Sequence, residues 1–337
     1  MTDSIYFNGF GYYAPKRIID NAEMCTIVDT TDEWIQSRTG IKERHIVAPG
    51  ETCSDMGLVA ARQALEAAGM NADEITVIMC ATVSADSIVP STATRLQQKL
   101  GATKAMAFDF NAACSGYLYG MQIAQGLLAA NPEHKILLLA AEVLTSRTNW
   151  TDRTTCVLFG DGAGVAILSS EKRSPANPTI FSHNARLEGV MSAADGTQGD
   201  FLTAIGGTSG HPYKLGDTVG DEFFIKMNGR EVYKHAVRNM PALCNELMDS
   251  LGYTIDDIDA LIPHQANLRI IEAVGERLNM PAEKVFVNVQ KYGNTSCASI
   301  PLALGEAIEQ NFIRPGMRVL LTTFGGGLTW SAAILKF

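Results

Sequence analysis

The sequence predicts an α/β fold, and three observations support this prediction. The chain has 337 residues, of which 46% are hydrophobic and 19% charged, a composition typical of proteins with a substantial buried core. Short runs of Val, Ile and Leu alternate with longer helical patterns, as in sheets that helices cover on both faces. Features of the first half return in the second, which indicates either a duplicated fold with a pseudo-twofold axis or two ordinary βαβ units.

The first half supplies most of the expected elements. Apolar residues at helical spacing predict helices over 60–68 and 92–100, and a third helix that begins near Tyr117. Near-continuous apolar runs predict buried strands over four segments: 77–80, 105–110, 136–140 and 165–168.

The second half repeats this order at a nearly constant distance. The passage from Gly69 to Ala81 resembles the passage from Gly252 to His264, which lies 183 residues later. A parallel alignment pairs Cys114 with Asn294, at an offset of 180. We therefore expect two halves, residues 1–173 and 174–337. The Gly-, Ser-, Thr-, Asp- and Pro-rich segment 174–220 is expected to be a long irregular connection that covers one surface.

Composition also limits the function. The net charge of −9 argues against a nucleic-acid partner, so any anionic partner must meet a local basic patch. No apolar run is long enough to span a membrane, and the N-terminal Met-Thr-Asp-Ser does not begin a secretory signal. Seven cysteines without a CxxC pair are typical of reduced thiols, which predicts a cytoplasmic protein.

Cys114 stands at a small-residue corner between the strand 105–110 and the following helix. The unpaired N–H groups and the dipole of a helix start favour negative charge. We therefore expect this position to lower the thiol pKa and expose the sulfur, as a nucleophile requires. The alternative is a buried structural cysteine.

Three further corners carry polar or Gly-rich sequence. Pro263 ends strand hydrogen bonding and leaves His264 at the carboxyl edge of the sheet, where open α/β sheets bind ligands. Asn294 lies in a polar corner between an apolar strand and a small-residue helix. After the strand 318–321, the glycines of 325–327 allow a backbone N–H to face a developing oxyanion. Each corner alone is an ordinary turn or loop, but together they indicate one catalytic site.

Metal and phosphate-loop sites have less support. The chain has no short-range pair of Cys or His ligands, so no metal is expected. The GDGAG segment at 160–164 lacks the Lys-Ser/Thr of a phosphate loop and is interpreted as a tight turn.

The four corner motifs, NAACSG, PHQANLRI, YGNTSCAS and FGGG, resemble the ketoacyl-[acyl-carrier-protein] synthase III family of the thiolase superfamily. DEWIQSRTGIKERHI from Asp32, and TDR followed by FGDGAG, extend the resemblance over nearly the whole chain. It implies a duplicated five-layer αβαβα fold and a homodimer. It also implies the first condensation of type II fatty-acid synthesis, which converts acyl-CoA and malonyl-acyl-carrier-protein into β-ketoacyl-acyl-carrier-protein, CoA and CO₂.

The resemblance assigns roles to individual residues. Cys114 attacks the acyl thioester, the backbone N–H groups of Cys114 and Gly326 hold the oxyanion, and His264 and Asn294 stabilise the malonyl enolate. Trp34 stacks on the CoA adenine, with Arg153 on the other face of the adenine. The remaining substrate-binding residues are Thr30, Arg38, Val89, Asn267 and Phe324. Arg269, and more weakly Lys234, would receive the carrier protein. No cofactor is implied, because CoA and phosphopantetheine thioesters are substrates.

Alternatives within the superfamily differ at these motifs. A degradative thiolase needs a second Cys in the C-terminal Gly-rich loop, and elongating synthases use two His; this chain has neither feature. A Cys-His acyl-CoA hydrolase, and synthase III-like enzymes of secondary metabolism with another primer or acceptor, remain open. Two departures from the bacterial pattern leave the primer undecided. The connection at about 195–220 is long, and Val89 replaces the usual Phe of the pocket gate.

Overall fold

The apolar runs form the strands of one mixed sheet in the computed structural model, which describes residues 4–174 and 177–337. Met1 to Asp3, which entered the argument about a secretory signal, and residues 175–176 of the expected connection lie outside the described residues. Within the described part, the sheet has nine strands in the order β11-β12-β13-β8-β1-β7-β6-β4-β5. Their bounds are β1 Tyr6–Tyr13, β4 Val77–Ala81, β5 Met106–Phe110, β6 Lys135–Glu142, β7 Gly162–Ser169, β8 Ala185–Ala194, β11 Ala260–Pro263, β12 Arg318–Gly325 and β13 Thr329–Lys336.

The sheet consists of two halves with matching strand orders. In the first half, β4 pairs in parallel with β5 and β6, and β6, β7 and β1 follow in antiparallel pairs. In the second half, β11 pairs in parallel with β12, and β12, β13 and β8 follow in antiparallel pairs. The halves meet where β1 pairs with β8 through Tyr6–Arg186 and Phe7–Ala185.

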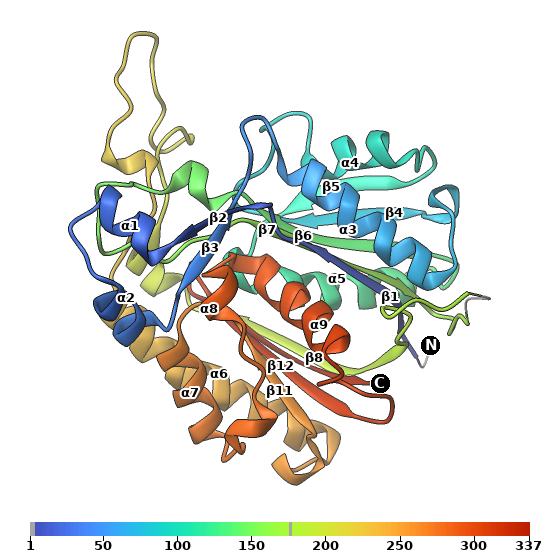
Figure 1. The fold of residues 1–337 in the computed structure, drawn as a ribbon. Helices are drawn as coiled ribbons and strands as arrows, with labels where there is room; N and C mark the ends of the chain where they lie inside the picture. The colour runs from blue at the N-terminus through green and yellow to red at the C-terminus, as the bar shows by residue number, and fades with distance from the viewer. Residues whose placement is uncertain (1–3, 175–176) are drawn as a thin grey trace.

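Helices cover both halves of the sheet and also separate them (Figure 1). In the middle layer lie α5 (Gly116–Ala130) and α9 (Ser299–Glu309), whose buried side chains share one core with both sheet halves. The outer layers are α3 (Cys53–Ala68) with α4 (Thr92–Leu100), and α6 (Gly229–Leu251) with α7 (Leu268–Arg277). This arrangement is the five-layer αβαβα fold with pseudo-twofold halves, so the predicted fold class is confirmed.

The repeat offset holds more strictly in the structure than in the sequence alignment. Residue numbers in β12 exceed their counterparts in β6 by 183, and α9 begins 183 residues after α5. The two corners before these helices have left-handed residues at Ala113 (φ 46°) and Ser296 (φ 51°), again 183 apart. Cys114 therefore corresponds to Cys297, and the predicted pairing of Cys114 with Asn294 is wrong by three positions.

Local sequence explains where the elements begin and end. The predicted helix 92–100 is confirmed as α4, because the Ser91 hydroxyl accepts from Thr94 N–H and Gly101 ends the helix with φ 80°. The predicted helix 60–68 begins earlier, since Thr52 forms a capping box before α3. None of the helices in the described part of the chain is long and apolar enough to cross a membrane.

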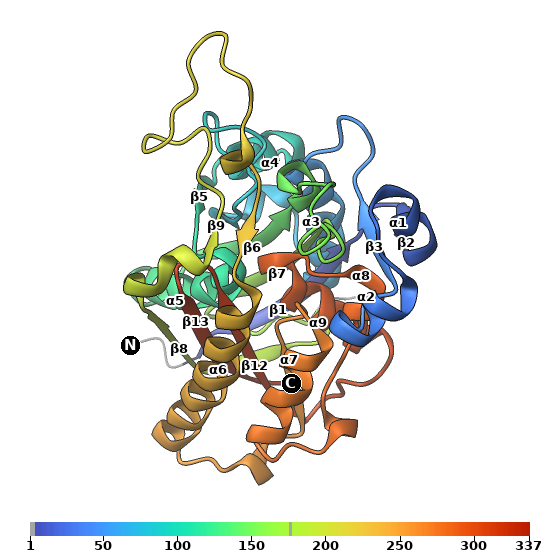
Figure 2. The ribbon, with the colours of Figure 1, turned by 90° about the vertical axis from the view of Figure 1, so that its left-hand side faces the viewer.

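The chain also forms several smaller elements, most of which are labelled in Figure 2. They are β2 Arg17–Asp20, α1 Asn21–Ile27, α2 Asp32–Thr39, β3 Glu43–Ile46, β9 Leu202–Thr203, β10 Lys226–Met227 and α8 Val289–Tyr292. The segment before Asn294 is not the strand expected there. It forms α8 and contributes one isolated bridge between Leu261 and Val285.

The connection 174–220 is less irregular than expected, because it contains β8, which pairs along most of β13. Beyond β8 the chain forms a loop, drawn in yellow, that projects from the top of the molecule in both ribbon views (Figures 1 and 2). β8 was missed because its neighbours are rich in turn-forming residues.

Candidate active site

A cavity of about 1120 Å³ lies between the two halves and opens beside α2 and α6. Its wall brings together nine of the residues singled out in the sequence: Trp34, Arg38, Cys114, His264, Asn267, Arg269, Asn294, Phe324 and Gly326. The other four singled-out residues, Thr30, Val89, Arg153 and Lys234, do not line it.

Cys114 lies in a short 3₁₀ turn, Ala113–Ser115, directly before α5. The side chain is only 8% exposed, and burial raises its pKa to about 12, while a hydrogen bond with the Ser296 side chain acts in the opposite direction. The expected exposed sulfur with a lowered pKa is therefore wrong for this structure. The physical reason is that α5 lies between the two sheet halves, so the loss of hydration outweighs the effect of the helix start.

The Gly-rich loop lies against the Cys114 corner. A Cβ atom on Gly325 would lie 2.7 Å from the Cys114 nitrogen, so only glycine permits this approach. Thr329 Oγ1 donates to the Ala112 carbonyl at 3.0 Å, and Ser115 Oγ donates to the Thr329 carbonyl at 3.1 Å. Within residues 4–174 and 177–337, no backbone carbonyl accepts from Cys114 N–H or Gly326 N–H, so both donors remain free to bind an oxyanion.

His264 follows the last residue of β11, as its position after Pro263 predicted. Its backbone N–H donates to the Thr322 carbonyl at 2.8 Å, and its Nδ1 lies 2.6 Å from Ser299 Oγ. The imidazole is 4% exposed, and burial lowers its pKa to about 4. His264 is therefore neutral at physiological pH and carries one ring N–H.

Asn294 is held by its backbone and by its side chain. Its N–H donates to the Leu158 carbonyl at 2.8 Å, and its own carbonyl accepts from Gly160 N–H at 3.1 Å. Its Oδ1 accepts from Ser296 N–H at 2.9 Å, which leaves the amide group of the side chain as a donor for the cavity. The GDGAG segment is not the tight turn expected at 160–164, because residues 162–164 already belong to β7; its first residue, Gly160, helps to fix the position of Asn294.

Glu142, the last residue of β6, was not among the residues that the sequence predicted for the site. This fully buried carboxyl accepts from Val83 N–H at 3.1 and 3.2 Å, from Ser84 Oγ at 2.5 Å and from Cys297 Sγ at 3.1 Å. Burial raises its pKa, although these donors act in the opposite direction. Glu142 belongs to none of the four corner motifs. Its place directly after the apolar run LLLAA could have indicated a buried carboxyl at the end of a strand.

The cavity mouth carries aromatic and cationic side chains. The Arg153 guanidinium lies 4.9 Å from the centre of the Trp34 ring, and its Nη1 donates to the Asp29 carbonyl at 3.2 Å. Arg269 lies 6.0 Å from the centre of the Tyr233 ring. An adenine could stack between Trp34 and Arg153 only after the guanidinium moves away from the indole.

Asn267 and Lys234 have protein partners. Asn267 caps α7, because its Oδ1 accepts from Arg269 N–H at 2.9 Å, and its Nδ2 donates to the Arg38 carbonyl at 3.0 Å. Lys234 pairs with Glu231 at 3.2 Å on the exposed start of α6. Asn267 therefore joins α7 to α2 at the mouth, whatever substrate it contacts.

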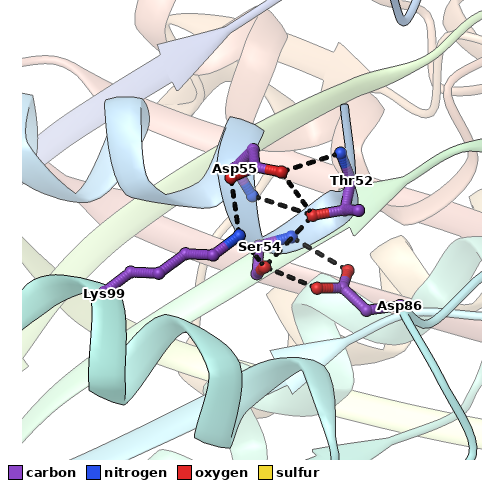
Figure 3. A network of polar contacts seen from close by, with 5 residues as sticks. All are labelled: Thr52, Ser54, Asp55, Asp86 and Lys99. Atoms are coloured by element: carbon purple, nitrogen blue, oxygen red, sulfur yellow. Dashed lines mark hydrogen bonds and ion pairs between the residues drawn. The ribbon is translucent and has the colours of Figure 1, made fainter. Parts of the chain in front are cut away.

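Val89 lies at the tip of the loop between β4 and α4. Ile88 and Val89 are 91% and 84% exposed, and a polar network fixes the base of the loop (Figure 3). In this network the Asp86 carboxylate accepts from Ser54 N–H at 3.0 Å and from Ser54 Oγ at 2.5 Å, and Lys99 Nζ donates to Ser54 Oγ at 2.7 Å. The two apolar side chains are thus presented to solvent from a fixed base.

All seven cysteines are free thiols. Across the ranges that the structure describes, no group of three His, Cys, Asp or Glu side chains is arranged to hold a metal ion.

Comparison with known proteins gives one consistent family. The family model described as 3-oxoacyl-[acyl-carrier-protein] synthase III matches residues 108–186, and the model of its C-terminal part matches residues 248–337. The β-ketoacyl-[acyl-carrier-protein] synthases III of Nitratidesulfovibrio vulgaris strain DP4 and Oleidesulfovibrio alaskensis are 54% identical to this chain and match over 100% of both sequences. The crystal structure of 3-oxoacyl-[acyl-carrier-protein] synthase III from Aquifex aeolicus superposes with a TM-score of 0.87 at 40% identity, covering 99% of this chain and 100% of that one.

Proposed function

Because this chain belongs to the β-ketoacyl-[acyl-carrier-protein] synthase III family, we propose that Cys114, His264 and Asn294 are its catalytic residues. The enzyme is a condensing acyltransferase that starts type II fatty-acid synthesis. Relatives that are 54% identical over their full length carry the fatty-acid name, so the alternative in secondary metabolism is not favoured. The observation that supports the catalytic assignment is the placement of all three side chains on one cavity wall.

In the first half-reaction, Cys114 Sγ attacks the carbonyl carbon of the acyl-CoA thioester. The free N–H groups of Cys114 and Gly326 hold the tetrahedral oxyanion, and the loss of one such donor typically costs ~10²–10³ in rate. Collapse forms acyl-Cys114, and the thiol proton ends on the CoA sulfur. Burial raises the pKa of Cys114 to about 12, so the neutral thiol is the resting form and its proton must be lost during acyl transfer.

In the second half-reaction, malonyl-acyl-carrier-protein enters the same cavity. His264 and Asn294 donate hydrogen bonds to the malonyl thioester oxygen, which carries negative charge as CO₂ leaves. The enolate carbon then forms a bond to the acyl carbonyl carbon and displaces Cys114 Sγ as a thiolate, which takes up a proton from solvent. A neutral His264 suits this role, because one of its ring nitrogens carries a proton and the group adds no buried charge.

The cavity mouth would receive the nucleotide and the carrier protein. The proposed contacts of CoA are Trp34 and Arg153 with the adenine, Thr30 and Arg38 with the nucleotide end, Asn267 with the pantetheine and Phe324 deeper in the cavity. Arg269, at the mouth, would attract the acidic carrier protein, and Lys234 contributes less because Glu231 already pairs with it.

We further propose a homodimer in which Val89 closes the acyl pocket of the partner subunit. The high exposure of Ile88 and Val89 on a fixed loop supports this assignment. The two halves of the duplicated fold are assigned to residues 1–173 and 174–337. The chemistry uses only side chains and thioester substrates, so it needs no metal or cofactor. Seven free cysteines and CoA-linked substrates support a cytoplasmic location.

Intact-mass measurement tests the nucleophile. Wild-type protein exposed to a panel of acyl-CoA primers should gain the mass of one acyl group, and Cys114→Ala should gain none. Cys25→Ala is the matched control, since Cys25 is an exposed thiol and the adduct should persist. An acyl adduct on Cys114→Ala would overturn the assignment.

A further inference from the structure

Ser299, the first residue of α9, faces the imidazole of His264 from the middle layer of the fold. Its side chain is 2% exposed, and its Oγ lies 2.6 Å from His264 Nδ1. The two residues are 35 positions apart in the sequence, so only the packing of α9 beside the end of β11 brings them together. A neutral imidazole has one N–H, and the hydrogen bond at one ring nitrogen decides which nitrogen carries it.

The partners of Ser299 Oγ determine the direction of this bond. Gln265 N–H donates to Ser299 Oγ at 3.4 Å, and this contact uses one lone pair of the hydroxyl. Among the described residues, His264 Nδ1 is the one acceptor within hydrogen-bond distance of Ser299 Oγ. The Ser299 hydroxyl proton therefore points at Nδ1, which must be the unprotonated nitrogen.

From this geometry we infer that Ser299 is a positioning residue, which holds neutral His264 in the tautomer that carries its proton on Nε2. Nε2 has no protein partner in the described parts of the chain, and His264 lines the cavity. An Nε2–H group donates to an oxygen that gains negative charge, whereas an unprotonated Nε2 would present a lone pair to that oxygen. The inference rests on the proposed role of His264 in enolate stabilisation.

Loss of the hydroxyl should act on one half-reaction. In Ser299→Ala, Nδ1 loses its donor, and the imidazole can carry its proton on either nitrogen. Removal of one oxyanion donor typically costs ~10²–10³ in rate, and a mixture of tautomers removes it from only part of the molecules. If between one half and one tenth of the molecules keep Nε2–H, decarboxylation of malonyl-acyl-carrier-protein should fall about two- to ten-fold, while Cys114 acylation by acyl-CoA should stay close to wild type.

The test combines two rate measurements with ¹⁵N NMR of histidine-labelled protein, in which His264→Ala identifies the His264 signals. The wild type should show an Nε2–H imidazole, Ser299→Ala a mixture, and Ser299→Thr, which keeps the hydroxyl, the wild-type tautomer with most of the decarboxylation rate. An Nδ1–H signal in the wild type would overturn the inference. The same would follow if the fraction of Nε2–H tautomer in Ser299→Ala were as high as in the wild type.

Two controls separate this inference from its premise. If His264→Ala decarboxylates normally, the proposed role of His264 fails, whatever Ser299 does. If His264→Ala is impaired while Ser299→Ala matches the wild type, only the inference fails. Should Ser299→Ala not fold, as judged by lost acylation, Ser299→Cys replaces it, because a thiol of similar size is a weak donor and should give an intermediate tautomer ratio.

Discussion

Replacement of Glu142 by Ala should destabilise the protein more than most single substitutions. The carboxyl accepts from Val83 N–H, Ser84 Oγ and Cys297 Sγ, and Glu142 itself is fully buried. Each buried donor left without an acceptor costs about 1–3 kcal/mol. With partial rearrangement, we expect a loss of about 3–5 kcal/mol and a fall in melting temperature on the order of 10 °C.

Urea unfolding followed by circular dichroism measures this loss, with Glu272→Ala on the exposed face of α7 as the matched control. The control should stay within about 0.5 kcal/mol of wild type. The same substitution should slow Cys114 acylation, because Glu142 holds Cys297 and the Val83–Ser84 segment beside the cavity. Equal stability of Glu142→Ala and Glu272→Ala would refute the claim that this carboxyl supports the site.

The pH dependence of stability gives a second test of Glu142. Burial raises its pKa above the ordinary value of 4.5, so the folded state binds more protons than the unfolded state just above pH 4.5. The part of the stability that comes from this pKa shift is therefore fully present below pH 4.5 and is lost as pH rises through the raised pKa, whereas the hydrogen bonds that the carboxyl accepts remain. Glu142→Gln does not titrate, so its stability should lack this decline. A decline identical in both proteins would contradict the assignment.

The remaining predictions concern the cavity and its mouth. Val89→Phe should shift primer preference from octanoyl-CoA toward acetyl-CoA by roughly one to two orders of magnitude, because each primer methylene that is no longer buried costs about 0.8 kcal/mol. An unchanged chain-length profile across acetyl-, butyryl-, isobutyryl- and octanoyl-CoA would contradict the proposed role of Val89 as the gate. Arg269→Glu should raise KM for malonyl-acyl-carrier-protein about ten-fold at low salt and less at high salt. The same substitution at the exposed Arg314 is the control, and equal effects of the two charge reversals would show that Arg269 does not bind the carrier protein. Arg153→Ala should weaken CoA binding in calorimetry while leaving pantetheine-thioester substrates unaffected, and a loss of the same size for both would exclude adenine stacking.

Local patterns were sufficient to predict most elements and the four corners of the site. Ser91 and Gly101 define both ends of α4, and Pro263 ends β11 directly before His264, because caps and strand termination depend on neighbouring residues. Two of the corners converge because β11 and β12 are parallel, which brings His264 and the Gly-rich loop to the same edge of the sheet.

Features that depend on long-range packing could not be predicted in this way. The helix start at Cys114 suggested an exposed thiol, but α5 is a central helix between two sheet halves. The residues around position 114 do not determine that α5 is covered on both sides. The bond between Glu142 and Cys297 joins residues 155 apart, and no spacing rule identifies such a pair. The three-residue error in the repeat alignment had the same cause, because the left-handed Ala113 and Ser296 mark equivalent corners only in the folded chain.

The central claim is that Cys114 performs acyl transfer, while His264 and Asn294 serve the malonyl half-reaction. The most direct measurement follows both half-reactions in His264→Ala and Asn294→Ala: intact mass reports the acyl group on Cys114, and release of labelled CO₂ from malonyl-acyl-carrier-protein reports decarboxylation. Both variants should load the acyl group at rates close to wild type, and decarboxylation should fall by about 10²–10³, the typical cost of one lost oxyanion donor. Normal CO₂ release by either variant, or failure of both to acylate Cys114, would contradict this division of roles.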